Sequence, residues 1–123
     1  MGIDLCLIPF QLIDDSAIPF SMLDLNRHSD LWPIIRALPT RPVPTEFRTF
    51  LSTEPIEGCS DYEFRHEGNT QTDAYDNPLL CIALNELLSI ADHPWIVNDW
   101  QNRATWAYLR ELPDSILVAL YWS

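Results

Sequence analysis

The chain contains no lysine. Its seven basic residues are all arginines, and they face eighteen aspartates and glutamates among 123 residues, so the formal net charge is −11. Without lysine there can be no P-loop lysine, no lysine Schiff base, no Ser–Lys dyad and no nuclease site of the PD-(D/E)xK type. Few cations and strong negative charge also disfavour direct binding to nucleic acid or to an anionic membrane. The composition instead predicts a positively charged protein partner.

Glycine and paired cysteines are also scarce. Only three glycines are present, and they form neither a GxGxxG nor a GxSxG motif, which excludes the common nucleotide cradles and nucleophile elbows. The sequence has no HExxH motif and no CxxC pair, so the frequent zinc patterns are missing as well. We therefore expect no cofactor. An odd number of cysteines without paired spacing favours a reducing compartment.

Long apolar runs are absent too. The longest, residues 79–84 and 116–122, are far too short to span a bilayer. Residues 1–15 lack the basic region that opens a signal peptide, so a cytoplasmic location is expected. Apolar residues nevertheless make up 47% of the chain, enough to build one core. The length predicts a single domain over residues 1–123.

The negative charge is distributed unevenly. Residues 1–53 carry a net charge of −2 and residues 93–123 a net charge of −1, whereas nine acids and one arginine give residues 54–92 a net charge of −8. Such a segment can be a solvated surface that keeps the protein soluble. Dense like charges also destabilise a compact state by mutual repulsion, which favours a function that uses them.

Hydrophobic periodicity predicts the following elements. Strands are expected at residues 2–10 (closed by Pro9), 46–53, 61–66 and 115–122, helices at 30–38, 86–92 and 99–112, a strand or helix lead-in at 79–84, and a polar loop at 69–78. Asn85 is expected to cap the second helix, Pro94 to end it, and a capping box of Asn98 and Gln101 to open the third.

This order of elements predicts an α+β fold. It would have one small mixed or antiparallel sheet and about three helices. The 115–122 segment is apolar on both faces, so it should lie inside the sheet and share it with the N-terminal strand. The 99–112 helix is apolar around much of its circumference and is expected to be central.

The aromatic residues divide into two groups. Trp106 and Trp122 are expected in the core, whereas Trp95 and Trp100 flank a helix start and are candidates for exposed anchors. Tyr62 and Tyr75 lie among the central acids. Acids interleaved with aromatics suit a surface that attracts and holds a basic protein.

The sequence signals for catalysis and for metal binding are weaker than those for binding a basic protein. The candidate ligands are Cys59, His66, Cys81 and His93 for zinc, and Glu67, Asp73, Asp76 and Asn77 for a hard cation such as calcium or magnesium. Neither set has a known spacing. Cys59 with His66 could form a nucleophilic pair, although a loop cysteine near a strand histidine is more often accidental. We expect neither a metal site nor an enzyme.

The leading hypothesis is a small acidic, cytoplasmic, non-enzymatic binding module. It would inhibit or neutralise a basic, nucleic-acid-binding protein, either as a phage-type anti-defence inhibitor that mimics nucleic acid or as an immunity protein against a basic nuclease toxin. The expected partner-binding residues are Glu54, Glu57, Asp61, Tyr62, Glu63, Glu67, Asp73, Tyr75 and Asp76.

Two other functions remain open. The first is a small metal-dependent or carboxylate-based enzyme acting near the 67–77 loop. The second is a component of a larger assembly, which would expose an apolar patch, with Trp95 and Trp100 as candidates. The sequence leaves the oligomeric state open.

Overall fold

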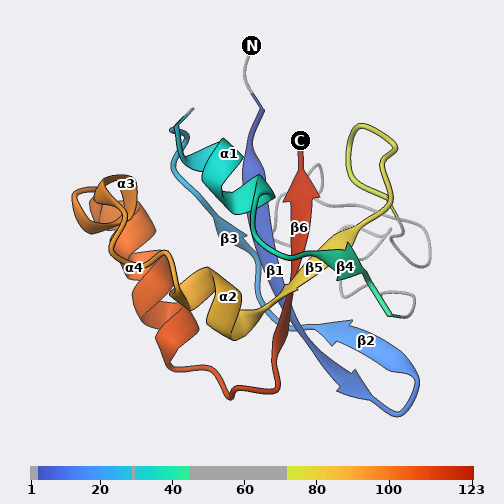
Figure 1. The fold of residues 1–123 in the computed structure, drawn as a ribbon. Coiled ribbons are helices and arrows are strands. Elements are labelled where there is room, and N and C mark those ends of the chain that lie inside the picture. The colour runs from blue at the N-terminus through green and yellow to red at the C-terminus, as the bar shows by residue number, and fades with distance from the viewer. Residues whose placement is uncertain (1–2, 29, 45–71) are drawn as a thin grey trace, which may run out of the picture.

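The computed structural model describes residues 3–28, 30–44 and 72–123 (Figure 1). These residues form an α+β domain. Its strands are β1 (Leu5–Ile13), β2 (Ser16–Pro19), β3 (Leu23–Asp24), β4 (Arg41–Pro42), β5 (Leu80–Ala83) and β6 (Leu117–Trp122). Its helices are α1 (Leu31–Arg36), α2 (Leu84–Leu88), α3 (Pro94–Val97) and α4 (Trp100–Arg110). The strands expected at residues 46–53 and 61–66 lie outside the described residues.

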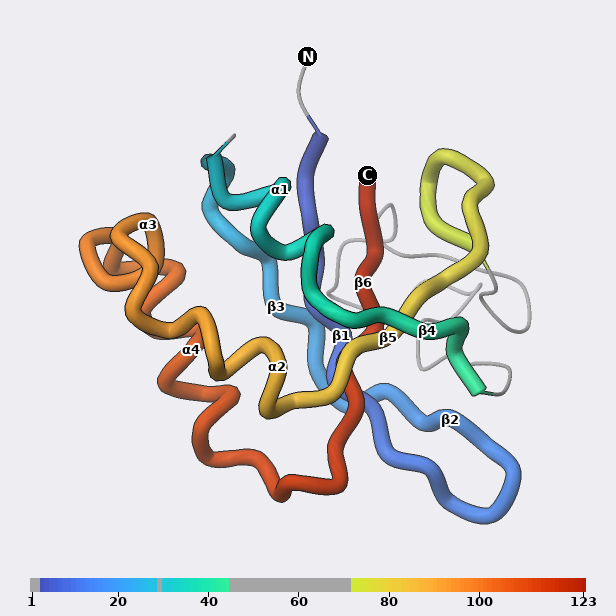
Figure 2. The backbone as a smooth tube through the Cα atoms, in the orientation of Figure 1, coloured from blue at the N-terminus to red at the C-terminus, as the bar shows by residue number. Residues whose placement is uncertain are grey.

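All six strands belong to one antiparallel sheet in the order β2-β1-β6-β5-β4, with β3 also paired to β1. β1 and β6 are matched over six residue pairs, from Leu5 opposite Trp122 to Phe10 opposite Leu117. Figure 2 shows these two strands running side by side although they lie at opposite ends of the sequence. The predicted pairing of the terminal strands and the interior position of the last strand are both confirmed.

The core has one cluster on each face of the sheet. The first cluster combines alternate residues of β1 and β6 with the inner sides of all four helices, including Leu7, Val118, Trp106 and Leu109. The second cluster holds the intervening residues, such as Cys6, Phe10 and Cys81. Because successive side chains of a strand point to opposite faces, a strand that is buried on both sides must be apolar throughout.

The N-terminal strand lies three residues further along the chain than predicted. It begins at Leu5, continues past Pro9 to Ile13 and turns back into β2, so β1 and β2 form a hairpin. Proline has no amide hydrogen to donate to a strand ladder. Pro9 is tolerated because no residue of β2 or β3 is paired with it, at the junction between these two strands. Its carbonyl accepts there from the Phe20 amide. Asp14 opens the turn at φ 55°, a left-handed conformation that aspartate adopts more readily than most residues.

Two predicted helix boundaries are wrong. Asn85 does not cap α2, which begins one residue earlier at Leu84. Pro94 does not simply end a helix but starts α3, because the first turn needs no amide donor from proline. The backbone amide of Trp95 donates to Nδ1 of His93, which caps this short helix.

The start and the setting of α4 also differ from prediction. Its N-cap is Asp99 rather than Asn98, and the Asp99 carboxylate accepts from the amides of Gln101 and Asn102. The helix is not central. Trp106 and Leu109 are buried, and Trp106 Nε1 donates to the Leu87 carbonyl at 2.9 Å. The other apolar stripe faces solvent and consists of Trp100, Ala104, Ala107 and Tyr108.

Candidate functional site

The described part of the expected binding surface is the loop of residues 72–78. It contains Asp73, Tyr75 and Asp76 of the nine predicted binding residues. The other six lie outside the described residues: Glu54, Glu57, Asp61, Tyr62, Glu63 and Glu67.

The side chain of Asp73 holds this loop together through hydrogen bonds. Its side chain is only 7% exposed, and Oδ1 accepts from the amide of Tyr75 at 2.8 Å and from that of Asn77 at 3.1 Å. The Asp73 amide donates to the Asn77 carbonyl, and the Ala74 amide donates to the Trp122 carbonyl at 3.0 Å. The loop is thus closed on itself and fastened to the end of β6. Sequence reasoning missed this structural role, although Asp followed closely by Asn-Pro is a typical turn signal.

The loop presents an aromatic ring and a carboxylate to solvent. Tyr75 is 50% exposed, and Asp76 is also exposed at φ 62°. Two consecutive residues of the expected surface are therefore accessible to a partner. The Asp73 carboxylate also influences Tyr121: burial of the Tyr121 hydroxyl and the nearby carboxylate both raise the pKa of Tyr121.

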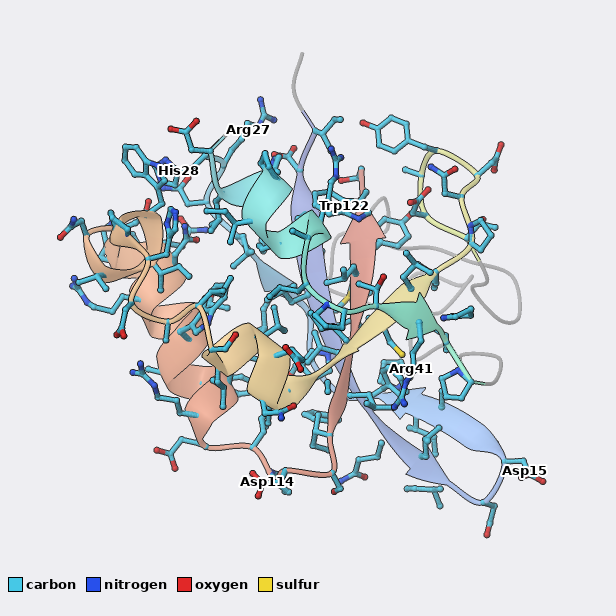
Figure 3. The ribbon with its side chains drawn as sticks, in the orientation of Figure 1. Asp15, Arg27, His28, Arg41, Asp114 and Trp122 are labelled. Carbon is cyan, nitrogen blue, oxygen red and sulfur yellow. The ribbon has the colours of Figure 1, made fainter. Side chains whose placement is uncertain are left out.

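A groove of about 640 Å³ lies beside the loop. The start of β1, the end of α1 and the end of β6 supply its other walls, and its lining includes Ile3, Arg36, Asp73, Tyr75, Leu80 and Trp122. Figure 3 shows Trp122 at the end of β6, next to α1. The volume falls within the range of small-molecule sites.

The described arginines differ in what they contact. Arg27 is bound to both carboxylate oxygens of Asp4 at 2.9 Å, and Arg103 donates to the Val97 carbonyl at 2.9 Å. Arg36 instead lies over the ring of Trp122, with Cζ 4.5 Å from the ring centroid. No described residue accepts a hydrogen bond from its guanidinium.

A second exposed surface lies at the corner where α3 meets α4. Trp100 is 72% exposed and Trp95 is 39% exposed, as expected for exposed anchors. The Trp95 ring stacks on His28, with centroids 4.3 Å apart and planes 14° apart. His28 Nε2 in turn lies 2.8 Å from Oδ2 of Asp99.

Asp99 organises this corner. Besides capping α4, its Oδ2 accepts from Asn26 at 2.7 Å. These bonds, chiefly the one with His28, lower the pKa of Asp99 from the usual 3.8 to about 2. Asn102 adds a second link, since its side chain bonds both backbone groups of Asn26 and the Trp95 carbonyl. Residues 26–28 are thus held against the start of α4.

Among the described residues, the zinc candidates Cys81 and His93 lie on different elements, whereas the hard-cation candidates Asp73, Asp76 and Asn77 share the 72–78 loop. Cys81 is buried in β5, while His93 is at the start of α3. Burial raises the pKa of the Cys6 and Cys81 thiols. In residues 3–28, 30–44 and 72–123, no three His, Cys, Asp or Glu side chains lie close enough together to hold a metal ion. Cys59, His66 and Glu67 lie outside these ranges.

Comparisons with protein-family models, with curated proteins and with solved structures found no match to this chain. Among the described helices, none has the length and hydrophobicity needed to cross a bilayer.

Proposed function

We propose that this chain is a cytoplasmic, non-enzymatic binding module that inhibits or neutralises a basic, nucleic-acid-binding protein. Its working surface would include the acids of residues 54–92 together with Tyr75 and Asp76 of the 72–78 loop. An anti-defence inhibitor that mimics nucleic acid and an immunity protein against a nuclease toxin are the two settings that suit this chemistry.

One observation carries the proposal: the most acidic segment of the chain contains a loop, residues 72–78, whose aromatic ring and carboxylate are both exposed. Asp73 fixes the loop, so Tyr75 and Asp76 are presented without a large loss of chain entropy on binding. Carboxylates accelerate association with a basic partner, and a tyrosine ring can hold its arginine or lysine side chains.

A second candidate is a small-molecule-binding protein or carboxylate-based enzyme that acts at the groove beside the loop. The groove supports it because Asp73 lines a space of about 640 Å³. The Asp73 carboxylate, however, already accepts two loop amides on Oδ1, which suits a structural role better than proton transfer.

The proposal is tested by charge removal in two places. One variant replaces Asp61, Glu63 and Glu67 by Asn or Gln, and a matched control replaces Asp14, Glu111 and Asp114, three exposed acids outside residues 54–92. Both lose three charges and keep side-chain size. Proteins captured from native host extract by the wild type are identified by mass spectrometry, and the association rate is then measured for the purified partner.

The central variant should associate at least tenfold more slowly, equivalent to about 1.4 kcal/mol of lost steering. The control variant should change the rate much less, and added salt should narrow the difference because it screens the charges. Equal losses in both variants would mean that net charge alone governs recognition. If neither variant loses binding, or if the captured partner is not basic, the proposal is wrong.

A further inference from the structure

The groove beside the 72–78 loop has an apolar floor that is open to solvent. Ile3 and Leu80 are each 38% exposed and Tyr75 is 50% exposed, and all three side chains line the same groove. Exposed large apolar residues that occur singly need no explanation, whereas several that converge on one concave surface indicate a binding site.

The polar end of the groove is the Arg36 guanidinium, for which no acceptor is found among the described residues. Arg36 contacts the Trp122 ring, and among the described residues no carbonyl or carboxylate accepts from it. Arg27 shows the ordinary alternative, a two-point ion pair with Asp4.

A chain of aromatic contacts holds Arg36 in place. Trp122, beneath the guanidinium, meets Trp32 edge to face at a centroid distance of 5.9 Å and an angle of 83°. Trp32 Nε1 donates to the Ile3 carbonyl at 2.7 Å, which ties α1 to the start of β1. Stacking on a fixed ring restrains the planar guanidinium while its N–H groups stay available. Two parallel N–H groups of a guanidinium match the two oxygens of a carboxylate.

Asp73 also lines the groove and keeps its negative charge, but its carboxylate is engaged elsewhere. It forms no ion pair with Arg36, and two loop amides already donate to its Oδ1. Among the described residues that line the groove, Arg36 is the one cation, so its end of the groove suits an anion next to an apolar group.

We propose that this groove binds a carboxylate that carries an aromatic or branched aliphatic body. Arg36 holds the carboxylate in a two-point hydrogen bond, and Ile3, Tyr75 and Leu80 contact the apolar body. The same chemistry is offered by a free small acid and by the C-terminal residue of a peptide. This site shares Tyr75 with the proposed acidic surface, but its anion-binding group, Arg36, lies outside that surface, so the two proposals are tested separately.

The test uses four probes: indole-3-acetate, tryptamine, and a tetrapeptide ending in tryptophan with either a free or an amidated C-terminus. Affinity is measured by calorimetry, and the binding position by chemical-shift changes at Arg36 Nε–H and Trp122 Nε1–H in labelled protein. At least one of the two carboxylate probes should bind at these positions, and tryptamine and the amidated peptide should bind at least tenfold more weakly. Whichever carboxylate binds more tightly identifies the source.

Matched variants separate the guanidinium from the apolar floor. Arg36→Gln should weaken binding at least tenfold, and Arg36→Lys should retain part of the wild-type affinity. Leu80→Asn should also weaken binding, although it leaves the charge of the groove unchanged. Arg110→Gln, an exposed arginine outside the groove lining, should leave the affinity unchanged. The proposal is overturned if neither carboxylate binds, if the amide and amine bind as well as the acids, or if a folded Arg36→Gln variant retains full affinity.

Discussion

The 72–78 loop and the α3–α4 corner use the same device for different purposes. In each, an aspartate carboxylate accepts two backbone amides that follow it closely in sequence, Tyr75 and Asn77 for Asp73, Gln101 and Asn102 for Asp99. Each segment also exposes aromatic rings. The two aspartates differ in the segments that they connect. The side-chain hydrogen bonds of Asp73 stay within its loop, whereas Asp99 also binds Asn26 and His28, more than seventy positions away.

The difference shows how one side-chain type can fix either local or tertiary structure. A carboxylate whose bonds are local orders a loop but adds little to global stability, because the loop can open while the rest stays folded. A carboxylate that joins distant segments contributes to the cooperative unfolding of the whole domain. Substitutions at these two positions should therefore have different consequences.

Of the two aspartates, Asp99 is expected to show the larger effect when it is replaced by alanine. This substitution removes the α4 cap, which is worth about 0.5–2 kcal/mol, and charge-assisted hydrogen bonds worth about 1.5–3 kcal/mol. The expected loss of unfolding free energy is about 3 kcal/mol, measured by urea denaturation. Asp99→Asn, which keeps an acceptor for the cap, should lose less. A loss below about 0.5 kcal/mol, typical of plain surface sites, would contradict the role given to Asp99.

The second effect is a pH dependence carried by the same carboxylate. Because folding lowers the pKa of Asp99 from 3.8 to about 2, its stabilisation is complete above pH 3.8 and is lost as the pH falls through 2. Thermal unfolding measured between pH 5 and pH 2 should show a steeper fall for the wild type than for Asp99→Asn. Parallel curves for the two proteins would show that Asp99 does not titrate as described.

A smaller effect is expected for Asp73→Ala. Global unfolding should change by about 1 kcal/mol, whereas the amides of Tyr75 and Asn77 should exchange with solvent much faster because they lose their acceptor. Hydrogen exchange read residue by residue separates these outcomes. If amide protection falls equally across β6 and α4, the loop is coupled to the whole domain and the proposed contrast fails.

The smallest effect is expected for Trp100→Ala. Trp100 is 72% exposed, so the free energy of unfolding should change by less than about 0.5 kcal/mol. Trp106→Ala, on the buried side of the same helix, should cost about 3–5 kcal/mol and serves as the comparison. A large loss of stability for Trp100→Ala would mean that this ring has a structural role.

The sheet was more predictable from the sequence than the ends of its elements. The terminal strands could be paired because β6 is apolar on both faces, a pattern that only an interior strand sustains. The hairpin at Asp14 and the short helix at Pro94 were missed because proline and acidic residues serve more than one kind of turn. The exposed stripe of α4 was misjudged because Trp100 and Tyr108 are as apolar as core residues, and only tertiary packing decides which stripe is buried.

The candidate site was predictable in its charges but not in its geometry. Tyr75 and Asp76 are predicted at a binding surface, and both are exposed in a loop that hydrogen bonds close on itself. Asp73 was grouped with them, yet its carboxylate faces its own backbone, a distinction that composition cannot make. Arg36 was not singled out, because its importance depends on α1 bringing it over Trp122, a residue far away in the chain.

The position of β6 has a consequence for how the chain is made in the cell. In the described sheet β6 lies between β1 and β5, so these two strands share no neighbour until residues 117–122 have left the ribosome. During translation β1 and β5 each carry an unpaired edge, which invites pairing with other nascent chains. A product truncated before Leu117 would keep both of these edges unpaired and should therefore be prone to aggregate.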